Sequence, residues 1–312
     1  MSPFLALLIG LVVLTLGAEL LVRGSSALAL RLGLTPLVVG LTVVAFGTSA
    51  PELVVSLQAA QKDSAEIAVG NVVGSNLCNL ALILGLCALI RPLTTNRSVI
   101  WREVPILIGA TLIATLFLID GDLGPKEGFV LVIALFIYTT VTIRQARRDP
   151  DQNLGSDVPQ SMGLIRAILF TVGGMAALLY GSDLFVEGAV ELAYLWGWSE
   201  AMIGLTIVAI GTSLPELAIS VVAVKNGETN VAIGNVVGSS LFNLMGILGV
   251  ATIAAGGIVV TLQPVDLAML VVVTLALWPL VQTGHRIDRR EGAALLFAYL
   301  AYAAWLFTAR YA

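Results

Sequence analysis

Long hydrophobic stretches separated by short polar segments run through the whole chain. Each is close to the length that a helix needs to cross a bilayer, although the fourth, fifth and ninth need polar flanks to complete a span. The ten stretches are residues 3–22, 36–60, 67–90, 104–119, 128–143, 164–186, 201–224, 231–255, 265–281 and 292–308. The pattern predicts an all-α polytopic membrane protein with ten transmembrane helices.

Composition supports this prediction. Of the 312 residues, 58% are hydrophobic and 12% charged, and the mean hydropathy is +0.98. These values exclude an ordinary soluble globular domain, for which the hydrophobic share is lower and the charged share about twice as large. The net charge of −4 is small. It offers no support for nucleic acid binding. The expected partners are the lipid bilayer and the transported ions, and nothing indicates an obligate protein partner.

The basic residues predict an orientation. With ten spans and the N-terminus outside, all but three of the 16 Lys and Arg residues fall in inside loops, the exceptions being Lys62, Lys126 and Arg310. Positive residues are enriched in cytoplasmic loops. We therefore expect a multi-pass protein of the cell (inner) membrane with both termini outside.

The chain contains an internal repeat. Residues 40–86 align without a gap to residues 204–250, at an offset of 164, and 26 of the 47 aligned positions are identical. This similarity divides the chain into a first five-helix repeat (1–143), a cytoplasmic linker (144–163) and a second five-helix repeat (164–312). Because five is odd, the second copy must lie upside down in the membrane, as in transporters built from inverted-topology repeats. The acidic counterparts Glu19 and Asp183 are expected near helix ends.

The first repeated motif places a proline and a glutamate inside a hydrophobic stretch. Gly-Thr-Ser-x-Pro-Glu occurs at residues 47–52 and again at 211–216. Pro51 and Pro215 cannot donate a backbone hydrogen bond, so each helix should break there and free carbonyl oxygens. Irregular backbone at membrane depth is tolerated where it is buried in protein or lines a cavity, which a cation could occupy. The hydroxyls add further oxygen atoms: Thr48, Ser49, Thr212 and Ser213.

Glu52 and Glu216 are the most informative residues of this motif. A carboxylate at the bilayer centre costs about 3 kcal/mol on insertion scales. No Lys or Arg lies in either of the two hydrophobic stretches that hold these glutamates. The sequence therefore predicts that a cation or a proton compensates the two carboxylates.

The second repeated motif, Gly-Asn-x-x-Gly-Ser-x-x-x-Asn, spans residues 70–79 and 234–243. Asn71, Ser75 and Asn79 are four residues apart and fall on one helix face. The glycines and polar residues could serve helix packing alone. Beside the glutamates, oxygen ligation is the favoured interpretation, and Asn243 and Ser239 repeat the pattern in the second half.

The chemistry of these groups favours hard cations. Carboxylate, hydroxyl, amide and carbonyl oxygens suit Ca²⁺ and Na⁺, whereas Zn²⁺ or Cu⁺ would require thiolate or imidazole ligands. Cys78 and Cys87 are interpreted as small core residues. Two carboxylates give a charge of about −2, which one Ca²⁺ or two Na⁺ neutralise, and an empty site would leave desolvated anions. This predicts exchange in place of uniport.

The repeated motifs resemble those of the sodium/calcium exchangers of the calcium/cation antiporter superfamily, over essentially the whole chain. The resemblance implies a compact antiporter that exchanges Ca²⁺ for Na⁺ by alternating access, with the ions bound as substrates and no cofactor. It implies Ca²⁺ ligation by Glu52, Glu216, Thr48 and Thr212. It also implies Na⁺ ligation by Ser49, Ser213, Ser75, Ser239 and the carbonyls of Ala45 and Ala209, with Asn79 and Asn243 near the centre. Some relatives have aspartate at position 243, a pattern of potassium-dependent members, so potassium co-transport is not expected.

Three alternatives remain. Buried carboxylates can bind protons, which leaves a Ca²⁺/H⁺ antiporter open. A passive cation channel could use the same oxygens, and counter-transport would decide against it. An intramembrane enzyme is disfavoured, because the single histidine, His285, lies in a basic loop and no metal or phosphate-binding motif accompanies it.

Overall fold

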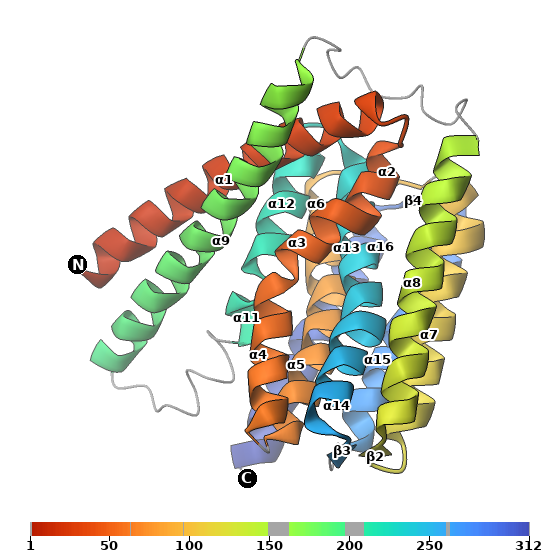
Figure 1. The fold of residues 1–312 in the computed structure, drawn as a ribbon. Helices are drawn as coiled ribbons and strands as arrows, with labels where there is room; N and C mark the ends of the chain where they lie inside the picture. The colour runs from red at the N-terminus through yellow and green to blue at the C-terminus, as the bar shows by residue number, and fades with distance from the viewer. Residues whose placement is uncertain are drawn as a thin grey trace. The chain divides into compact units, whose positions relative to one another are not determined.

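The computed structural model describes residues 2–62, 64–95, 97–148, 162–196, 209–259 and 263–311, which are largely helical (Figure 1). The α-helices are α1 (Pro3–Arg31), α2 (Pro36–Val39), α3 (Ala45–Thr48), α4 (Ala50–Gln61), α5 (Ala65–Leu77), α6 (Leu84–Ile90), α7 (Val104–Leu118), α8 (Pro125–Arg148), α9 (Leu164–Leu195), α11 (Ala209–Gly211), α12 (Leu214–Lys225), α13 (Thr229–Leu241), α14 (Leu248–Ala255), α15 (Pro264–Gln282) and α16 (Arg289–Tyr311). Wider π-helical segments join several of them: η1 (Gly40–Val44), η2 (Cys78–Ile83), η3 (Val99–Glu103) and η6 (Phe242–Ile247). A short 3-10 turn, η7 (Thr283–His285), follows α15.

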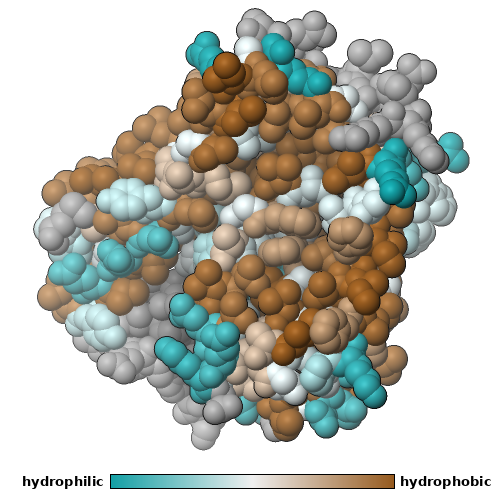
Figure 2. Space-filling view, in the orientation of Figure 1, coloured by the Kyte–Doolittle hydropathy of each residue, from teal (hydrophilic) through white to brown (hydrophobic). Residues whose placement is uncertain are grey.

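The described helices confirm a multi-pass membrane protein. Seven helices are long and apolar enough to cross a bilayer, and the bent pair formed by residues 36–48 and 50–61 makes an eighth candidate. Large hydrophobic side chains lie exposed on several helices, including Ile165 and Phe136, as helices that face lipid require. Figure 2 shows that hydrophobic residues cover much of the visible face. Residues 201–208 of the seventh predicted stretch lie outside the described residues, so the count of ten stays a prediction.

Two of the long helices extend further than their hydrophobic stretches. The first continues to Arg31 and the sixth, α9, to Leu195. Glu19 and Asp183 therefore lie well within helices, and the expectation that they lie near helix ends was wrong. The ends of the hydrophobic stretches are not the ends of these helices, because charged residues can continue a helix beyond the hydrophobic core of the membrane. Helix α8 similarly runs to Arg148, so the first residues of the predicted linker are helical, and residues 149–161 lie outside the described part.

The chain divides into two compact units that each take residues from both sequence halves. Unit 1 comprises residues 1–51 and 141–235, and unit 2 comprises residues 52–140 and 236–312. Two of the three boundaries, between Pro51 and Glu52 and between Asn235 and Val236, fall inside the repeated motifs, and the third falls between Thr140 and Val141.

Unit 1 is dominated by the contact between α1 and α9, which lie side by side in Figure 1. The contact is close because glycines face the opposite backbone. A Cβ atom added at Gly17 would overlap the backbone nitrogen of Leu178, and one at Gly181 would overlap that of Leu14. These glycines are counterparts at the repeat offset of 164, so the two copies of one small-residue surface pack against each other.

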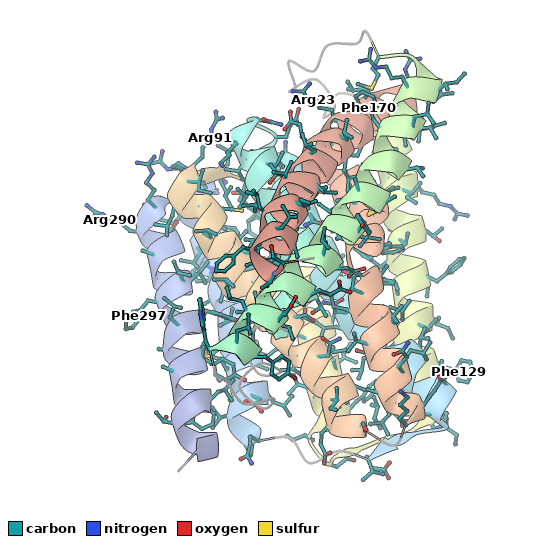
Figure 3. All side chains as sticks on the ribbon, turned by 90° about the vertical axis from the view of Figure 1, so that its left-hand side faces the viewer. Arg23, Arg91, Phe129, Phe170, Arg290 and Phe297 are labelled. Carbon is teal, nitrogen blue, oxygen red and sulfur yellow. The ribbon has the colours of Figure 1, made fainter. Side chains whose placement is uncertain are left out.

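Unit 2 is tied together by two pairs of short antiparallel strands that the hydrophobic pattern did not predict. Strand β1 (Leu93–Thr94) pairs with β4 (Arg286–Ile287), and β2 (Asp122–Leu123) pairs with β3 (Ile258–Val259). Each pair joins one sequence half to the other. Figure 3 shows Arg91 and Arg290 at the same end of the packed helices α6 and α16.

Unit 2 also contains a duplicated tyrosine–carboxylate hydrogen bond. The hydroxyl of Tyr138 donates to Oε2 of Glu103 at 2.7 Å, and Glu103 also accepts from Nε of Arg102 at 2.6 Å. In the second half, the hydroxyl of Tyr302 donates to Oδ1 of Asp266 at 2.7 Å. Both carboxylates are buried, with 0% and 7% of the residue exposed. Each bond therefore links the fourth hydrophobic segment of a repeat to the fifth.

Candidate cation site

Both predicted helix breaks are present. In the first half, α3 ends at Thr48 and α4 begins at Ala50, so Ser49 stands at the junction. In the second half, α11 ends at Gly211 and α12 begins at Leu214. Each proline occupies the first turn of the following helix, where a missing N–H costs no hydrogen bond. Helices α4 and α12 therefore begin just before the prolines, and Glu52 and Glu216 lie in their first turns.

One of the carbonyls expected to be freed has a protein partner. The hydroxyl of Ser182, on α9, donates to the carbonyl oxygen of Gly211 at 3.3 Å. The carbonyl of Ala45, a predicted Na⁺ ligand, accepts from the backbone nitrogen of Ser49 at 3.0 Å and lies 3.3 Å from Oγ1 of Thr48. Both carbonyls therefore have donors within the protein, a serine hydroxyl for Gly211 and a backbone N–H for Ala45.

Unit 1 brings together predicted ligands from the two sequence halves. The hydroxyl of Ser49 donates to Oε1 of Glu216 at 2.8 Å. Oγ1 of Thr48 lies 3.2 Å from Oδ1 of Asn235 and can donate to it. All four residues are fully buried. A carboxylate and two hydroxyls therefore lie in one desolvated cluster of oxygen atoms.

Asn235 is a central member of this cluster, although only its motif position drew attention to it. Its Nδ2 donates to the carbonyl oxygen of Glu216 at 3.3 Å and to Oγ of Ser220 at 3.0 Å. Unit 2 repeats the arrangement. There Nδ2 of Asn71 donates to the carbonyl oxygen of Glu52 at 3.1 Å and to Oγ of Ser56 at 2.9 Å. Ser56 and Ser220 were missed, yet they are identical residues at the repeat offset of 164.

Unit 2 holds the other set of predicted ligands. Glu52 is buried, with 1% of its surface exposed, and Ser239 is buried completely. Nδ2 of Asn243 donates to Oγ of Ser75 at 2.9 Å, which joins the second motif of one half to that of the other. Asn79 is also buried.

Several predicted ligand oxygens make no hydrogen bond to the described part of the protein. They are Oγ1 of Thr212 in unit 1, and Oδ1 of Asn79 and of Asn243 in unit 2. A buried oxygen without a donor is costly unless a cation or water binds it. These three atoms are therefore chemically suited to ligate a cation.

Two π-helical segments shape the asparagine positions. Segment η2 begins at Cys78 and η6 begins at Phe242, so Asn79 and Asn243 each occupy the second position of a widened helical turn. Such widened turns redirect side chains and are frequent at functional sites. The four-residue spacing of Asn71, Ser75 and Asn79 in the sequence did not predict these widened turns.

The remaining predicted ligands have less structural detail. Ser213 lies at the N-cap of α12 and is 1% exposed. Ala209 is the first residue of α11. Within the described residues, no group of three or more His, Cys, Asp or Glu side chains could hold a metal ion.

Known proteins match this chain over nearly its full length. The profile of the family described as "Sodium/calcium exchanger protein" matches residues 2–144 and 166–308. The putative antiporter CaxA of Alkalimonas amylolytica is 40% identical over 96% of this chain and 97% of its own. The sodium/calcium exchanger MaX1 of Methanosarcina acetivorans is 31% identical over 97% and 98% of the two chains.

Solved structures of the sodium-calcium exchanger NCX_Mj share the fold. One of them superposes with a TM-score of 0.86 at 31% identity and covers 97% of this chain and 98% of the exchanger. The profile match in each half begins and ends at positions that differ by 164, the offset of the internal repeat. The family is one of transporters and not of enzymes. The chain belongs to the sodium/calcium exchanger family.

Proposed function

We propose that this protein is a secondary active antiporter that exchanges Ca²⁺ for Na⁺ across the membrane. The observation that carries the proposal is the bond between Ser49 and Glu216, in which a hydroxyl of one repeat contacts the carboxylate of the other. Such a contact makes a site of oxygen ligands that depends on both repeats. The choice of Ca²⁺ and Na⁺ as the two exchanged ions rests on the sodium/calcium exchanger family and on the similarity to the exchanger MaX1.

In this proposal Glu52 and Glu216 neutralise the cation, and neutral oxygens complete its coordination. The set of ligands is the one that the sequence predicts: Thr48, Thr212, Ser49, Ser213, Ser75, Ser239, Asn79, Asn243 and the carbonyls of Ala45 and Ala209. Ca²⁺ requires six to eight oxygens. The uncommitted oxygens of Thr212, Asn79 and Asn243 support their assignment to this shell.

The proposed mechanism follows from charge balance. Two desolvated carboxylates without cations would be unfavourable, so the protein changes its accessible side readily only when ions are bound. One Ca²⁺ and two Na⁺, which carry equal charge, compete for the same oxygens. Competition of this kind couples the downhill movement of one ion to the uphill movement of the other.

We further propose ten spans in two inverted five-helix repeats, 1–143 and 164–312, joined by a cytoplasmic linker at 144–163, with both termini outside. Each predicted span overlaps a helix or bent helix in the described residues. The position of Arg91 and Arg290 at one end of α6 and α16 suits a shared cytoplasmic side. Placement in the cell (inner) membrane follows from the same reasoning, and no cofactor or protein partner is needed.

The test is transport by purified protein in vesicles. Na⁺-loaded proteoliposomes are diluted into Na⁺-free buffer with a protonophore present, and ⁴⁵Ca²⁺ uptake is measured. We expect uptake that requires the outward Na⁺ gradient and that disappears in Glu52→Gln and in Glu216→Gln. Glu66→Gln and Glu187→Gln are matched controls. They remove the same charge, but from glutamates that lie exposed on α5 and α9.

The same vesicles separate the alternatives. Uptake that an imposed pH gradient drives without Na⁺ would establish Ca²⁺/H⁺ exchange through the buried carboxylates and overturn the sodium proposal. Ca²⁺ flux that needs no counter-ion on the opposite side would establish a channel.

A further inference from the structure

Asn235 occupies an unusual position between residues of both repeats. It is fully buried and contacts three oxygen atoms: the carbonyl of Glu216, the hydroxyl of Ser220 and the hydroxyl of Thr48. Two of these belong to one helix, α12, and the third belongs to the helix break of the first half. The asparagine is thus a direct link between two proposed Ca²⁺ ligands that are far apart in the sequence.

The neighbours of Asn235 determine which way its amide points. Its NH₂ group faces the carbonyl of Glu216 and Oγ of Ser220, at 3.3 and 3.0 Å. A reversed amide would bring its oxygen against the carbonyl oxygen of Glu216, which cannot donate. The amide oxygen therefore faces Thr48.

This orientation in turn directs the hydroxyl of Thr48. Both nearby groups, Oδ1 of Asn235 at 3.2 Å and the carbonyl of Ala45 at 3.3 Å, are acceptors. The single hydroxyl proton must point toward them, which leaves the oxygen lone pairs directed elsewhere. A hydroxyl ligates a cation through a lone pair, so an acceptor at this position prepares Thr48 for ligation.

The second effect of Asn235 is on the helix that carries Glu216. The carbonyl of Glu216 has two lone pairs, and Nδ2 of Asn235 occupies one of them at the start of α12. The hydrogen bond to Ser220, one turn later, fixes the same helix at a second point. Rotation of α12 would move the Glu216 carboxylate, so two anchors on this face hold its direction.

The same arrangement in the other unit argues that it is not incidental. Asn71, Ser56 and the carbonyl of Glu52 form the same two bonds, at 2.9 and 3.1 Å. Both glutamates are therefore held by an asparagine of the second motif and by a serine four residues after the glutamate. The duplicated chain thus keeps the same donor on the same carbonyl in both halves.

We propose that Asn235 and Ser220 are positioning residues, which orient Glu216 and Thr48 for cation binding without touching the ion. This inference rests on the proposed function. It predicts that loss of Asn235 weakens cation affinity much more than it lowers the amount of folded, active protein. Asn71 and Ser56 have the same role for Glu52.

The test measures affinity in two independent ways on the full-length protein. The first is the KM for Ca²⁺ in Na⁺-driven uptake, and the second is the rise in Tm that Ca²⁺ produces in detergent, because at a given concentration a ligand stabilises the folded protein more when it binds more tightly. We expect Asn235→Ala to raise KM by about tenfold or more and to reduce the Ca²⁺-dependent Tm rise, given the usual strength of hydrogen bonds to charged or ligating groups. Ser220→Ala keeps the contact to Glu216 and should have a smaller effect of the same kind.

Controls distinguish positioning from general destabilisation. Thr274→Ala removes another buried polar group, whose Oγ1 donates at 2.7 Å to the carbonyl of Leu270 in its own helix, α15. It should lower Tm without changing the KM for Ca²⁺. Combining Asn235→Ala with Thr48→Ala should raise KM by much less than the product of the single effects, because the asparagine acts partly through Thr48.

The outcomes are distinguishable. Wild-type exchange with an unchanged KM in Asn235→Ala, or effects of Asn235→Ala and Thr48→Ala that multiply fully, would overturn the positioning role and leave the proposed function intact. Wild-type vesicles that exchange no cations would overturn the proposed function, and the positioning role with it.

Discussion

Ser49 and Glu216 are separated by 167 positions in the sequence, yet the serine hydroxyl donates to the glutamate carboxylate at 2.8 Å. The hydrogen bond stabilises Oε1 of the carboxylate. Ser49 lies at the break between α3 and α4, which Pro51 causes, so the direction of its side chain depends on that break. The acceptor of its hydrogen bond belongs to the other repeat. The two repeats are thus chemically dependent on each other where their motifs meet in unit 1.

Ser49→Ala should lower the affinity for transported cations. The substitution removes a donor to Oε1 of Glu216 and one oxygen atom of the proposed Na⁺ shell. We expect the Na⁺ concentration that half-saturates exchange to rise about tenfold, since a charged hydrogen bond and a ligand are lost together. Ser64→Ala, at the partly exposed start of α5, is the control and should leave exchange unchanged. Equal half-saturation in both variants would contradict the assignment.

Gly174→Ala should destabilise the α1–α9 contact. A Cβ atom there would lie 2.5 Å from the backbone nitrogen of Leu21, and neither backbone can move without separating the helices. Overpacking of this kind costs about 1–3 kcal/mol. The adjacent Gly173 has no atom within 4 Å of an added Cβ. Gly173→Ala should therefore leave thermal unfolding in detergent unchanged or raise its midpoint, and a similar loss in both variants would refute the packing argument.

Tyr302→Phe should destabilise unit 2. It removes the donor to the buried carboxylate of Asp266, and a buried acceptor left without its donor costs about 1–3 kcal/mol. The corresponding change Tyr138→Phe should cost less, because Glu103 retains its bond from Arg102. Unfolding curves of the two variants test this order. Tyr180→Phe, on an exposed part of α9, provides the baseline.

The stability of the protein should depend on the charge of Glu228, which lies in the turn before α13. Burial raises the pKa of this carboxyl above its ordinary value of 4.5. A raised pKa means that the folded state binds the proton more tightly than the unfolded state, so this contribution to stability is present below pH 4.5 and is lost as the pH rises through the folded pKa.

Glu228→Gln mimics the protonated form and isolates that contribution. We expect the variant and the wild type to unfold at similar temperatures at low pH and the variant to be the more stable at neutral pH. Thermal unfolding at a series of pH values measures the difference. A difference that stays constant across the series would show that the charge of Glu228 has no effect on folding.

The sequence predicted much of the architecture because its signals were local or periodic. Hydrophobic stretches indicated the helices, and Pro51 and Pro215 indicated both breaks. It did not predict the π-helical turns at Asn79 and Asn243, since an extra residue in a helical turn leaves the hydrophobic pattern almost unchanged. It also placed Glu19 wrongly, because the hydrophobic stretch of α1 ends before the helix does.

Contacts between the repeats were beyond the reach of the pattern. Self-similarity reveals which residues correspond, such as Ser56 and Ser220, but it cannot reveal which copy contacts which. The bond between Ser75 and Asn243 is of this kind, as is the link from Thr48 to Asn235. Three-dimensional proximity converts a list of equivalent oxygens into particular donor and acceptor pairs.

The strand pairs of unit 2 have a consequence for biosynthesis. Strand β1 can pair with β4 only after the residues between them have been made, and α6 likewise packs against α16, where a Cβ at Gly85 would meet the carbonyl of Gly292 at 2.8 Å. Helix α6 must therefore enter the bilayer before α16 has been made, and until then the surface of α6 that packs against α16 stays uncovered. A chain that stops before α16 should lack this packing partner and be exposed to membrane quality control.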